Sequence, residues 1–295
     1  MPQTTWDVWT LTDGVTGLLR EWLWRQLSEP QSAWLAGELA KLSDGRARDL
    51  EIVFGSAPRR LGRADLNLSA DDLIEAEASR PGWDPRGWTV DDAARILALL
   101  RFAEAAGDFA DTFRQLCRTA EVGEAVALYR GLPLYPNPEL YEWQAGEGLR
   151  TSMRAVFEAI AHRSPYPKEA FSEDRWNHMV LKALFIGSVL APIQGLDERA
   201  NPTLARILSD YAHERWAAGR PVTLELWRCL GPFAEGDMVD DLVRLAGSQD
   251  GAERRAAALA LSVSPDERAS QVLQRLPVEA MMVKTGGLSW DSLSA

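Results

Sequence analysis

The sequence predicts an all-α protein, a multi-helical array of antiparallel helix pairs. Its 295 residues include 41 Ala and 39 Leu against 35 Val, Ile and Thr together, a balance that favours helices over strands. Several segments also carry helix-start signals, in which Asn or Ser precedes Pro or acidic residues. No segment alternates apolar and polar residues between hairpin turns, which a half-buried strand would do.

The start signals set the order of the helices. Asn137-Pro138 and Asn201-Pro202 each offer an N-cap followed by Pro at the first helical position, and Ser264-Pro265 adds Glu267 to complete a capping box. Thr89 and Ser69 are each followed by two acidic residues in the first turn. With the apolar spacing, these signals predict helices over 14–28, 31–42, 46–54, 69–79, 89–106, 108–119, 121–130, 138–162, 172–187, 202–218, 223–230, 236–246, 250–263 and 265–276.

Two stretches rich in Gly, Pro and Arg, residues 55–62 and 80–87, are the predicted linkers. The second divides the chain into an N-terminal helical subdomain, residues 1–86, and a helical-array domain, residues 87–295. Arg254, Ala257, Ala260 and Leu261 form an R-x-x-A-x-x-A-L face that resembles the second helix of a HEAT-type repeat. We therefore expect the array to resemble a HEAT-like right-handed solenoid.

Charge and cysteine content limit the possible partners and compartments. The net charge of −11 and pI near 4.9 argue against nucleic acid as the main partner. The two cysteines, Cys117 and Cys229, lie far apart in the sequence, and no secretory leader is apparent. We therefore expect both to be reduced thiols in the core. The longest apolar stretch, residues 179–193, is interrupted by Lys182 and is too short to span a bilayer. We expect a cytoplasmic protein without a transmembrane segment.

The chain is rich in Trp, with 12, and poor in His, with 3. The tryptophans nearest the N-terminus are Trp6, Trp9, Trp22, Trp24 and Trp34, and their clustering predicts core packing or docking to another protein. Trp22 has the helical offset of a core residue, and Trp24 falls on the other side of its helix.

The segment 133–232 embeds polar residues in otherwise apolar helices. Asp174, His178 and Lys182 follow one helix face at intervals of four, beside Asn177. Arg206, Asp210 and His213 share one face of the next predicted helix, with Glu214 adjacent. Asp197 and Arg199 lie in the intervening loop, and Arg220 follows the second helix. The candidate ligand-binding residues are therefore Asn177, His178, Lys182, Asp197, Arg199, Asp210, His213, Glu214 and Arg220.

Three interpretations of these polar residues remain open. Asp210 and His213, with His178 or Glu214, have a spacing that allows a metal site. Asp210, His213 and Arg199 also suit a buried polar network that links helices, and the whole set suits a small-molecule pocket. The chain has no H-E-x-x-H motif, no di-iron E-x-x-H pair and no Gly-rich phosphate loop. We therefore expect no metal and no cofactor, and assign no catalytic residue.

Three runs of the segment 133–232 resemble EboA proteins: residues 176–185, 195–202 and 210–220. Similarity is weaker at residues 147–151, 159–167 and 225–228. The resemblance is specific over residues 133–232. It implies a place beside a UbiA-like prenyltransferase, a dehydroquinate-synthase-like cyclase and a TatD-like hydrolase, in moving secondary-metabolite precursors from the bacterial cytoplasm towards the periplasm. We expect a non-catalytic binding or adaptor component, with these proteins and a small metabolite precursor as partners.

The alternative function is an enzyme or small-molecule carrier with a polar pocket. A pocket requires at least three of the candidate side chains to converge with unpaired polar atoms. An adaptor requires that they pair with one another, and that an apolar patch with exposed Trp lies elsewhere.

Overall fold

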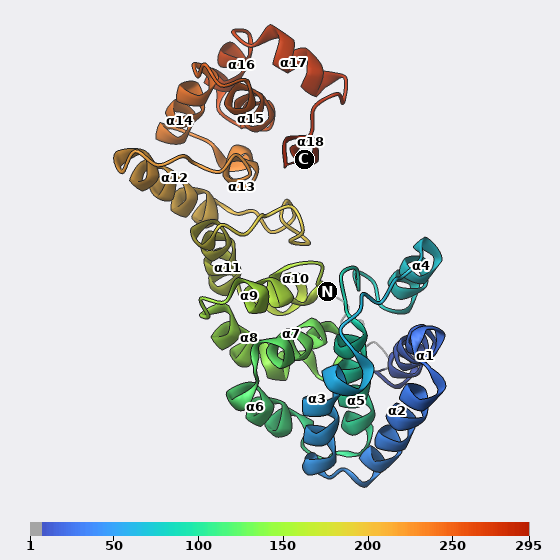
Figure 1. Ribbon diagram of the computed structural model, residues 1–295. Helices are drawn as coiled ribbons and strands as arrows, with labels where there is room; N and C mark the ends of the chain where they lie inside the picture. The colour runs from blue at the N-terminus through green and yellow to red at the C-terminus, as the bar shows by residue number, and fades with distance from the viewer. Residues whose placement is uncertain (1–7, 295) are drawn as a thin grey trace. The chain divides into compact units, whose positions relative to one another are not determined.

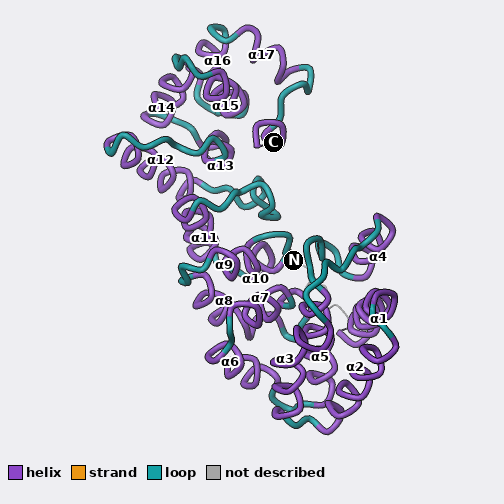
Figure 2. Tube along the Cα trace, in the orientation of Figure 1, coloured by secondary structure: helices purple, strands orange, loops and turns teal. Residues whose placement is uncertain are grey.

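The computed structural model describes residues 8–294 of the chain, and the side chains of residues 14–293. This part is helical and contains no strand, which confirms the all-α prediction (Figure 1). Outside the helices, Asp65 and Thr89 of the described chain form an isolated antiparallel bridge. Loops and turns connect the helices (Figure 2). Among the described residues, no helix combines the length and the apolar character needed to cross a membrane.

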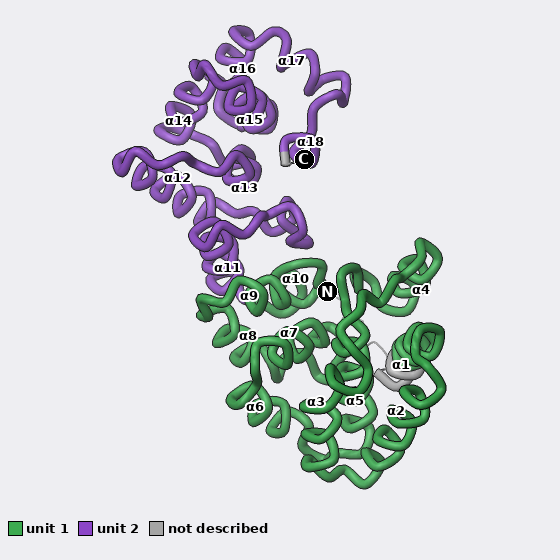
Figure 3. Tube along the Cα trace, in the orientation of Figure 1, with its two compact units in different colours: residues 1–171 green, residues 172–295 purple. Residues whose placement is uncertain are grey.

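The chain forms two compact units, residues 1–171 and 172–295 (Figure 3). The helices of the first unit are α1 (Val8–Gln26), α2 (Glu29–Lys41), α3 (Ala47–Leu61), α4 (Ala70–Ser79), α5 (Val90–Ala105), α6 (Phe109–Thr119), α7 (Val122–Arg130), α8 (Glu142–Leu149), α9 (Arg154–Ala161) and α10 (Tyr166–Ala170). Its short 3₁₀ helices are η1 (Leu42–Asp44), η2 (Leu132–Leu134) and η3 (Pro138–Tyr141).

The second unit continues in the same style. Its helices are α11 (Glu173–Ile186), α12 (Pro202–Ala217), α13 (Leu226–Leu230), α14 (Asp237–Ala246), α15 (Gly251–Ser262), α16 (Glu267–Leu273), α17 (Pro277–Lys284) and α18 (Trp290–Ser294), with the 3₁₀ helix η4 (Gly231–Phe233) after α13. The boundary expected between residues 86 and 87 does not coincide with this division. Helix α5 packs against α1 and α3, so the helices on both sides of residue 86 share one core.

Helix α5 is the centre of the first unit. Every residue from 90 to 100 is buried, because α1, α3 and α7 all pack on this helix. It starts at Thr89, whose hydroxyl accepts from the Asp92 amide in a capping box, as the sequence predicts. The equivalent box at Ser69 and Asp72 starts α4.

The predicted linker at residues 55–62 is wrong, since α3 continues to Leu61 and contains Pro58. Its residues Leu50, Val53, Phe54, Ala57 and Leu61 are all buried, so packing of this stripe outweighs the local effect of Gly55 and Pro58. Pro58 has no N–H for the Phe54 carbonyl four residues earlier. The Arg95 Nε from α5 donates to that carbonyl instead, over 3.0 Å.

The second predicted linker, residues 80–87, is a loop as expected, and it is anchored by aromatic packing. Trp83 is buried, with its ring centroid 5.4 Å from that of Trp22 in α1 and 5.9 Å from that of Trp88. Trp22 is fully buried too, which confirms its predicted place in the core.

Two local expectations need correction. The helix predicted over 138–162 is divided into η3, α8 and α9. Between α8 and α9, Thr151 Oγ1 accepts the Met153 amide in a turn that competes with the helix. The N-cap of α16 is Asp266, which accepts the Arg268 amide, and not Ser264. The Ser264 hydroxyl donates to the Ala234 carbonyl instead, over 2.8 Å.

Helix α15 is the centre of the second unit, where it packs against α13, α14, α16, α17 and α18. Its residues 256–261 are buried and are mostly Ala, which allows close approach of neighbouring backbone. Arg254 on the same helix donates to the carbonyls of Ser248 and Gln249. The solenoid arrangement stays a prediction.

Candidate functional site

The start of α12 is fixed by a pair of amides. Asn201 is the N-cap, as predicted, and its Oδ1 accepts the Leu204 amide over 2.8 Å, with Pro202 at the first helical position. Asn177 of α11 is 2% exposed and exchanges two hydrogen bonds with Asn201, of 2.9 and 3.2 Å. The candidate Asn177 thus joins α11 to the N-terminus of α12.

His213 has a different partner from the one that the spacing suggested. Its Nε2 lies 2.6 Å from Oδ1 of Asp241 in α14, and the other oxygen, Oδ2, accepts the Ser209 hydroxyl over 2.8 Å. The carboxylate is buried, whereas the His213 side chain is 52% exposed. Asp241 therefore bridges two residues of α12, and the network joins α12 to α14.

An aromatic stack continues from this network. The His213 ring lies 5.7 Å from that of Trp216, which stacks on Trp227 at 5.8 Å. The Arg244 guanidinium carbon lies 4.1 Å from the Trp216 ring centroid, within the range of a cation–π interaction. His213 thus lies at the exposed edge of a packed group, which limits its freedom to take up a ligand.

The two loop candidates have separate partners. Asp197 accepts two hydrogen bonds of 2.7 Å from Arg228, a bidentate ion pair that raises the pKa of the guanidinium. The Arg199 guanidinium carbon lies 4.8 Å from the ring centroid of the buried Trp176, and burial lowers the pKa of Arg199. Each pairing fastens a different part of the loop between α11 and α12.

The other candidates lie on α11 and α12 or, for Arg220, just after α12. His178, Asp210, Glu214 and Arg220 are exposed, and Lys182 is half-buried with its Nζ 6.0 Å from the Phe185 ring centroid. The stripe predicted on α11 therefore faces solvent. Ligand binding by the nine residues stays a prediction.

The nine candidates do not include four buried polar residues of this unit: Ser188, Ser209, Glu225 and Asp241. The carboxylate of Glu225 accepts the amides of Leu190 and Ala191, over 2.8 and 2.9 Å, and so holds the turn after α11. Asp241 carried a readable signal, because it falls on the same helical stripe as Met238 and Leu245, which is otherwise apolar. A carboxylate on such a stripe predicts a buried hydrogen-bonded partner.

The Asp241 carboxylate separates the serine hydroxyl from the imidazole. Ser209 and His213 both bind Asp241 and not each other, so the imidazole does not take the proton of the serine hydroxyl as a nucleophilic site requires. Burial raises the pKa of both free thiols, Cys117 and Cys229, to about 12, which keeps them protonated near neutral pH. Within the described part of the chain, no three His, Cys, Asp or Glu side chains form a group that fits a metal ion.

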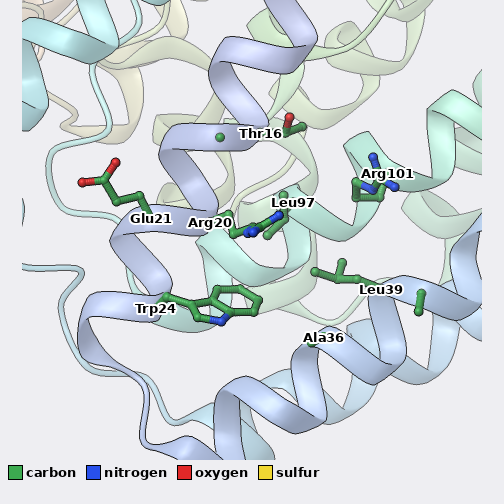
Figure 4. A pocket seen from close by; sticks show the side chains of 10 residues that line it. Thr16, Arg20, Glu21, Trp24, Ala36, Leu39, Leu97 and Arg101 are labelled. Atoms are coloured by element: carbon green, nitrogen blue, oxygen red, sulfur yellow. The ribbon is translucent and has the colours of Figure 1, made fainter.

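An open groove of about 1000 Å³ lies in the first unit between α1, α2 and α5 (Figure 4). Its lining comes from small and apolar side chains of the three helices, together with Trp24 and two arginines: Thr16, Gly17, Arg20, Glu21, Trp24, Ala36, Leu39, Ala40, Leu97 and Arg101. Figure 4 shows Glu21 on the side of α1 away from Leu39 and Arg101.

The groove contains one of the tryptophans singled out by the sequence. Trp24 is half-buried and Arg20 lies over its ring at 5.9 Å, while Trp34 in α2 is half-buried under Arg60 at 6.0 Å. Trp6 and the side chain of Trp9 lie outside the described residues. A more exposed tryptophan that the sequence did not single out is Trp143 in α8, at 61%.

Comparison with known proteins agrees with the similarity seen in the α11 and α12 region. The family model described as metabolite traffic protein EboA matches residues 15–231. The chain belongs to the EboA family. The EboA match extends beyond residues 133–232 to the groove-lining residues of α1, α2 and α5, and it ends before α14, which carries Asp241. No curated protein and no solved structure matches the chain.

Proposed function

We propose that this chain is a non-catalytic binding component, an adaptor, in the bacterial traffic of secondary-metabolite precursors from the cytoplasm towards the periplasm. Membership of a family described as metabolite traffic proteins supports the place in traffic. The observation that carries the binding role is the groove between α1, α2 and α5, with its apolar lining and Trp24. In this proposal the protein acts in the cytoplasm and its helices form a HEAT-like array.

The groove suits an amphipathic helix of a partner protein. The half-buried Leu39 and the exposed Ala36 and Ala40 offer a surface that an apolar helix face covers without directed polar contacts, whereas Leu97 in the same lining is already buried. The arginines are already engaged within the protein, Arg20 over Trp24 and Arg101 with Glu104 at 2.5 Å. The other polar lining residues are Thr16 and Glu21, and most of the lining is apolar or small, which favours a protein partner over a small molecule.

The proposed partners are the UbiA-like prenyltransferase, the dehydroquinate-synthase-like cyclase and the TatD-like hydrolase that EboA resemblance implies. We would co-express the full chain with each of them and measure co-purification. The test variant is Ala36→Glu, which puts a charge into the groove at an exposed position of α2. The matched control is Ala33→Glu, an exposed position on the same helix outside the groove lining.

We expect at least one partner to co-purify with the wild type and with Ala33→Glu, and to be lost with Ala36→Glu. Equal melting temperatures of the two variants would show that the loss is local. Retention of every partner by Ala36→Glu would refute the groove as the binding surface. Loss with Trp143→Ala alone would place binding at the exposed aromatic of α8 instead.

The same co-purification assay, carried out with Asp210→Ala, tests the nine candidate residues of α11, α12 and their flanks. Since Asp210 is exposed and lies outside the groove lining, we expect this variant to keep its protein partners. Kept partners with lost metabolite output in the cell would favour the alternative, an enzyme or small-molecule carrier that uses these polar residues.

A further inference from the structure

We propose that a second pocket, in the first unit, binds a small phosphate-bearing anion. This pocket has a volume of about 180 Å³. It is bordered by helices α7 and α9 and by the loop that follows α4. Its lining combines two buried tryptophans with cationic side chains: Trp83, Asp84, Arg86, Trp88, Val126, Arg130, Ala155, Glu158, Ala159, His162, Arg163 and Ser164. The proposal goes beyond the adaptor role, because the groove is formed by other residues.

The first argument is the sharing of one carboxylate by two arginines. Arg86 donates to both oxygens of Asp84, with Nε–Oδ1 and Nη2–Oδ2 distances of 2.8 and 2.5 Å. Arg163 approaches the same carboxylate with its Nε 3.6 Å from Oδ2, beyond a normal hydrogen bond. One carboxylate balances one guanidinium, so the group of Arg86, Arg163 and Asp84 keeps one positive charge, carried by arginines that are 60% and 46% exposed at the rim of the pocket lining.

The neighbouring charges do not cancel this excess. Arg130 pairs with Asp92 at 2.5 Å, and Glu158 pairs with Arg154 at 2.6 Å. The ion pairs named here join four arginines, Arg86, Arg163, Arg130 and Arg154, to three carboxylates, Asp84, Asp92 and Glu158. A local excess of cations is notable in a chain whose net charge is −11.

The second argument is the backbone of Arg163. This residue has a φ of 50°, the left-handed region that L side chains other than Asn and Asp rarely adopt. The buried Ser164 and Pro165, which follow it, hold the chain in this conformation before α10. The fold therefore keeps an arginine at the pocket where glycine would have the lower backbone energy.

The third argument is size and shape. A volume of about 180 Å³ is below the ~300–1,000 Å³ typical of sites for drug-sized ligands, which favours a small anion such as phosphate. Guanidinium groups present N–H donors in a planar fork that matches the oxygens of phosphate. The buried rings of Trp83 and Trp88 give the pocket a rigid wall.

The test is isothermal titration calorimetry of the full chain with inorganic phosphate at constant ionic strength. The main variant is Arg163→Gly, which removes the guanidinium and relieves the positive φ, so its melting temperature should equal or exceed that of the wild type. Arg86→Gln is a second variant at a side chain that is 60% exposed. Arg48→Gln, an exposed position of α3 outside the pocket, is the control for charge.

We expect phosphate to bind the wild type and Arg48→Gln equally, and to bind Arg163→Gly and Arg86→Gln at least tenfold more weakly. Phenyl phosphate and vesicles containing phosphatidic acid separate a soluble phosphate ester from a lipid headgroup. The proposal is overturned if the wild type shows no phosphate binding, if both pocket variants bind as the wild type does, or if vesicles bind and soluble phosphates do not.

Discussion

His213 of α12 and Asp241 of α14 are joined through Nε2 and Oδ1 over 2.6 Å, although 28 positions separate them in the chain. The Asp241 carboxylate also holds the buried Ser209 hydroxyl, so its two oxygens serve two residues of one helix. The histidine is half in solvent and the carboxylate is not. Removal of the Asp241 side chain should therefore lower the free energy of unfolding more than removal of the His213 side chain.

We predict that Asp241→Ala lowers the free energy of unfolding by about 1–3 kcal/mol, because Ser209 loses its acceptor in a buried place. His213→Ala should cost at most about 1 kcal/mol, since the side chain is largely exposed. Urea unfolding of both variants and of the double variant gives the coupling between them, expected at about 0.5–1.5 kcal/mol. Equal losses for the two single variants would contradict the bridging role of Asp241.

The His213–Asp241 pair also shows which features of the site the sequence predicts and which it does not. The N-cap at Asn201 and the shared face of Asp210 and His213 follow from local spacing, and both lie on α12 as expected. The choice between Asp210 and Asp241 as the partner of His213 depends on which helix packs against α12, which spacing within one helix does not specify. Similarly, the break predicted at Gly55 was overruled by burial of the α3 stripe on α5.

Arg25 and Asp72 predict a pH dependence in the first unit. Arg25 donates two hydrogen bonds to the Asp72 carboxylate, of 2.7 and 3.0 Å, and this pairing lowers the pKa of Asp72 to about 2 from its ordinary 3.8. A lowered pKa stabilises the folded state above pH 4, and the contribution is lost as the pH falls from about 4 to 2.

We expect Arg25→Gln to lower the free energy of unfolding at pH 6 by about 1 kcal/mol, since Arg25 is 43% exposed and solvent screens the pair. The difference from wild type should shrink towards zero near pH 2. Urea titrations at pH 6, 4 and 2.5 check this. A difference that stays constant over the range would contradict an origin in the Asp72 carboxylate.

Two glycines predict opposite effects of the same substitution. A Cβ on Gly55 of α3 meets nothing within 4 Å, whereas a Cβ on Gly231 lies 2.9 Å from the backbone of Ala260 in α15. Gly55→Ala should therefore raise the free energy of unfolding by about 0.5–1 kcal/mol through higher helix propensity. Gly231→Ala should lower it by about 1–3 kcal/mol through overpacking. Thermal unfolding in the same buffer tests both signs, and a destabilised Gly55→Ala would contradict the helical account of residue 55.

In the first unit the Arg95 side chain replaces a backbone N–H donor that Pro58 lacks, and this replacement can be tested by mutation. The buried Arg95 of α5 donates to Asp91 and Gly123, and its Nε serves the Phe54 carbonyl that Pro58 leaves without a helical N–H. Arg95→Met should cost about 3–5 kcal/mol, because the Asp91 carboxylate loses its cation in the core.

Part of that loss belongs to the Phe54 carbonyl, and Pro58→Ala restores a donor to it. In the wild type the carbonyl already has Arg95, so Pro58→Ala adds little there beyond helix propensity. In the Arg95→Met background the new amide fills a vacant acceptor, and the gain should be larger by about 1 kcal/mol. Urea unfolding of the two single variants and the double variant measures this difference. Strict additivity would mean that Arg95 does not compensate for the proline, and that α3 tolerates Pro58 for another reason.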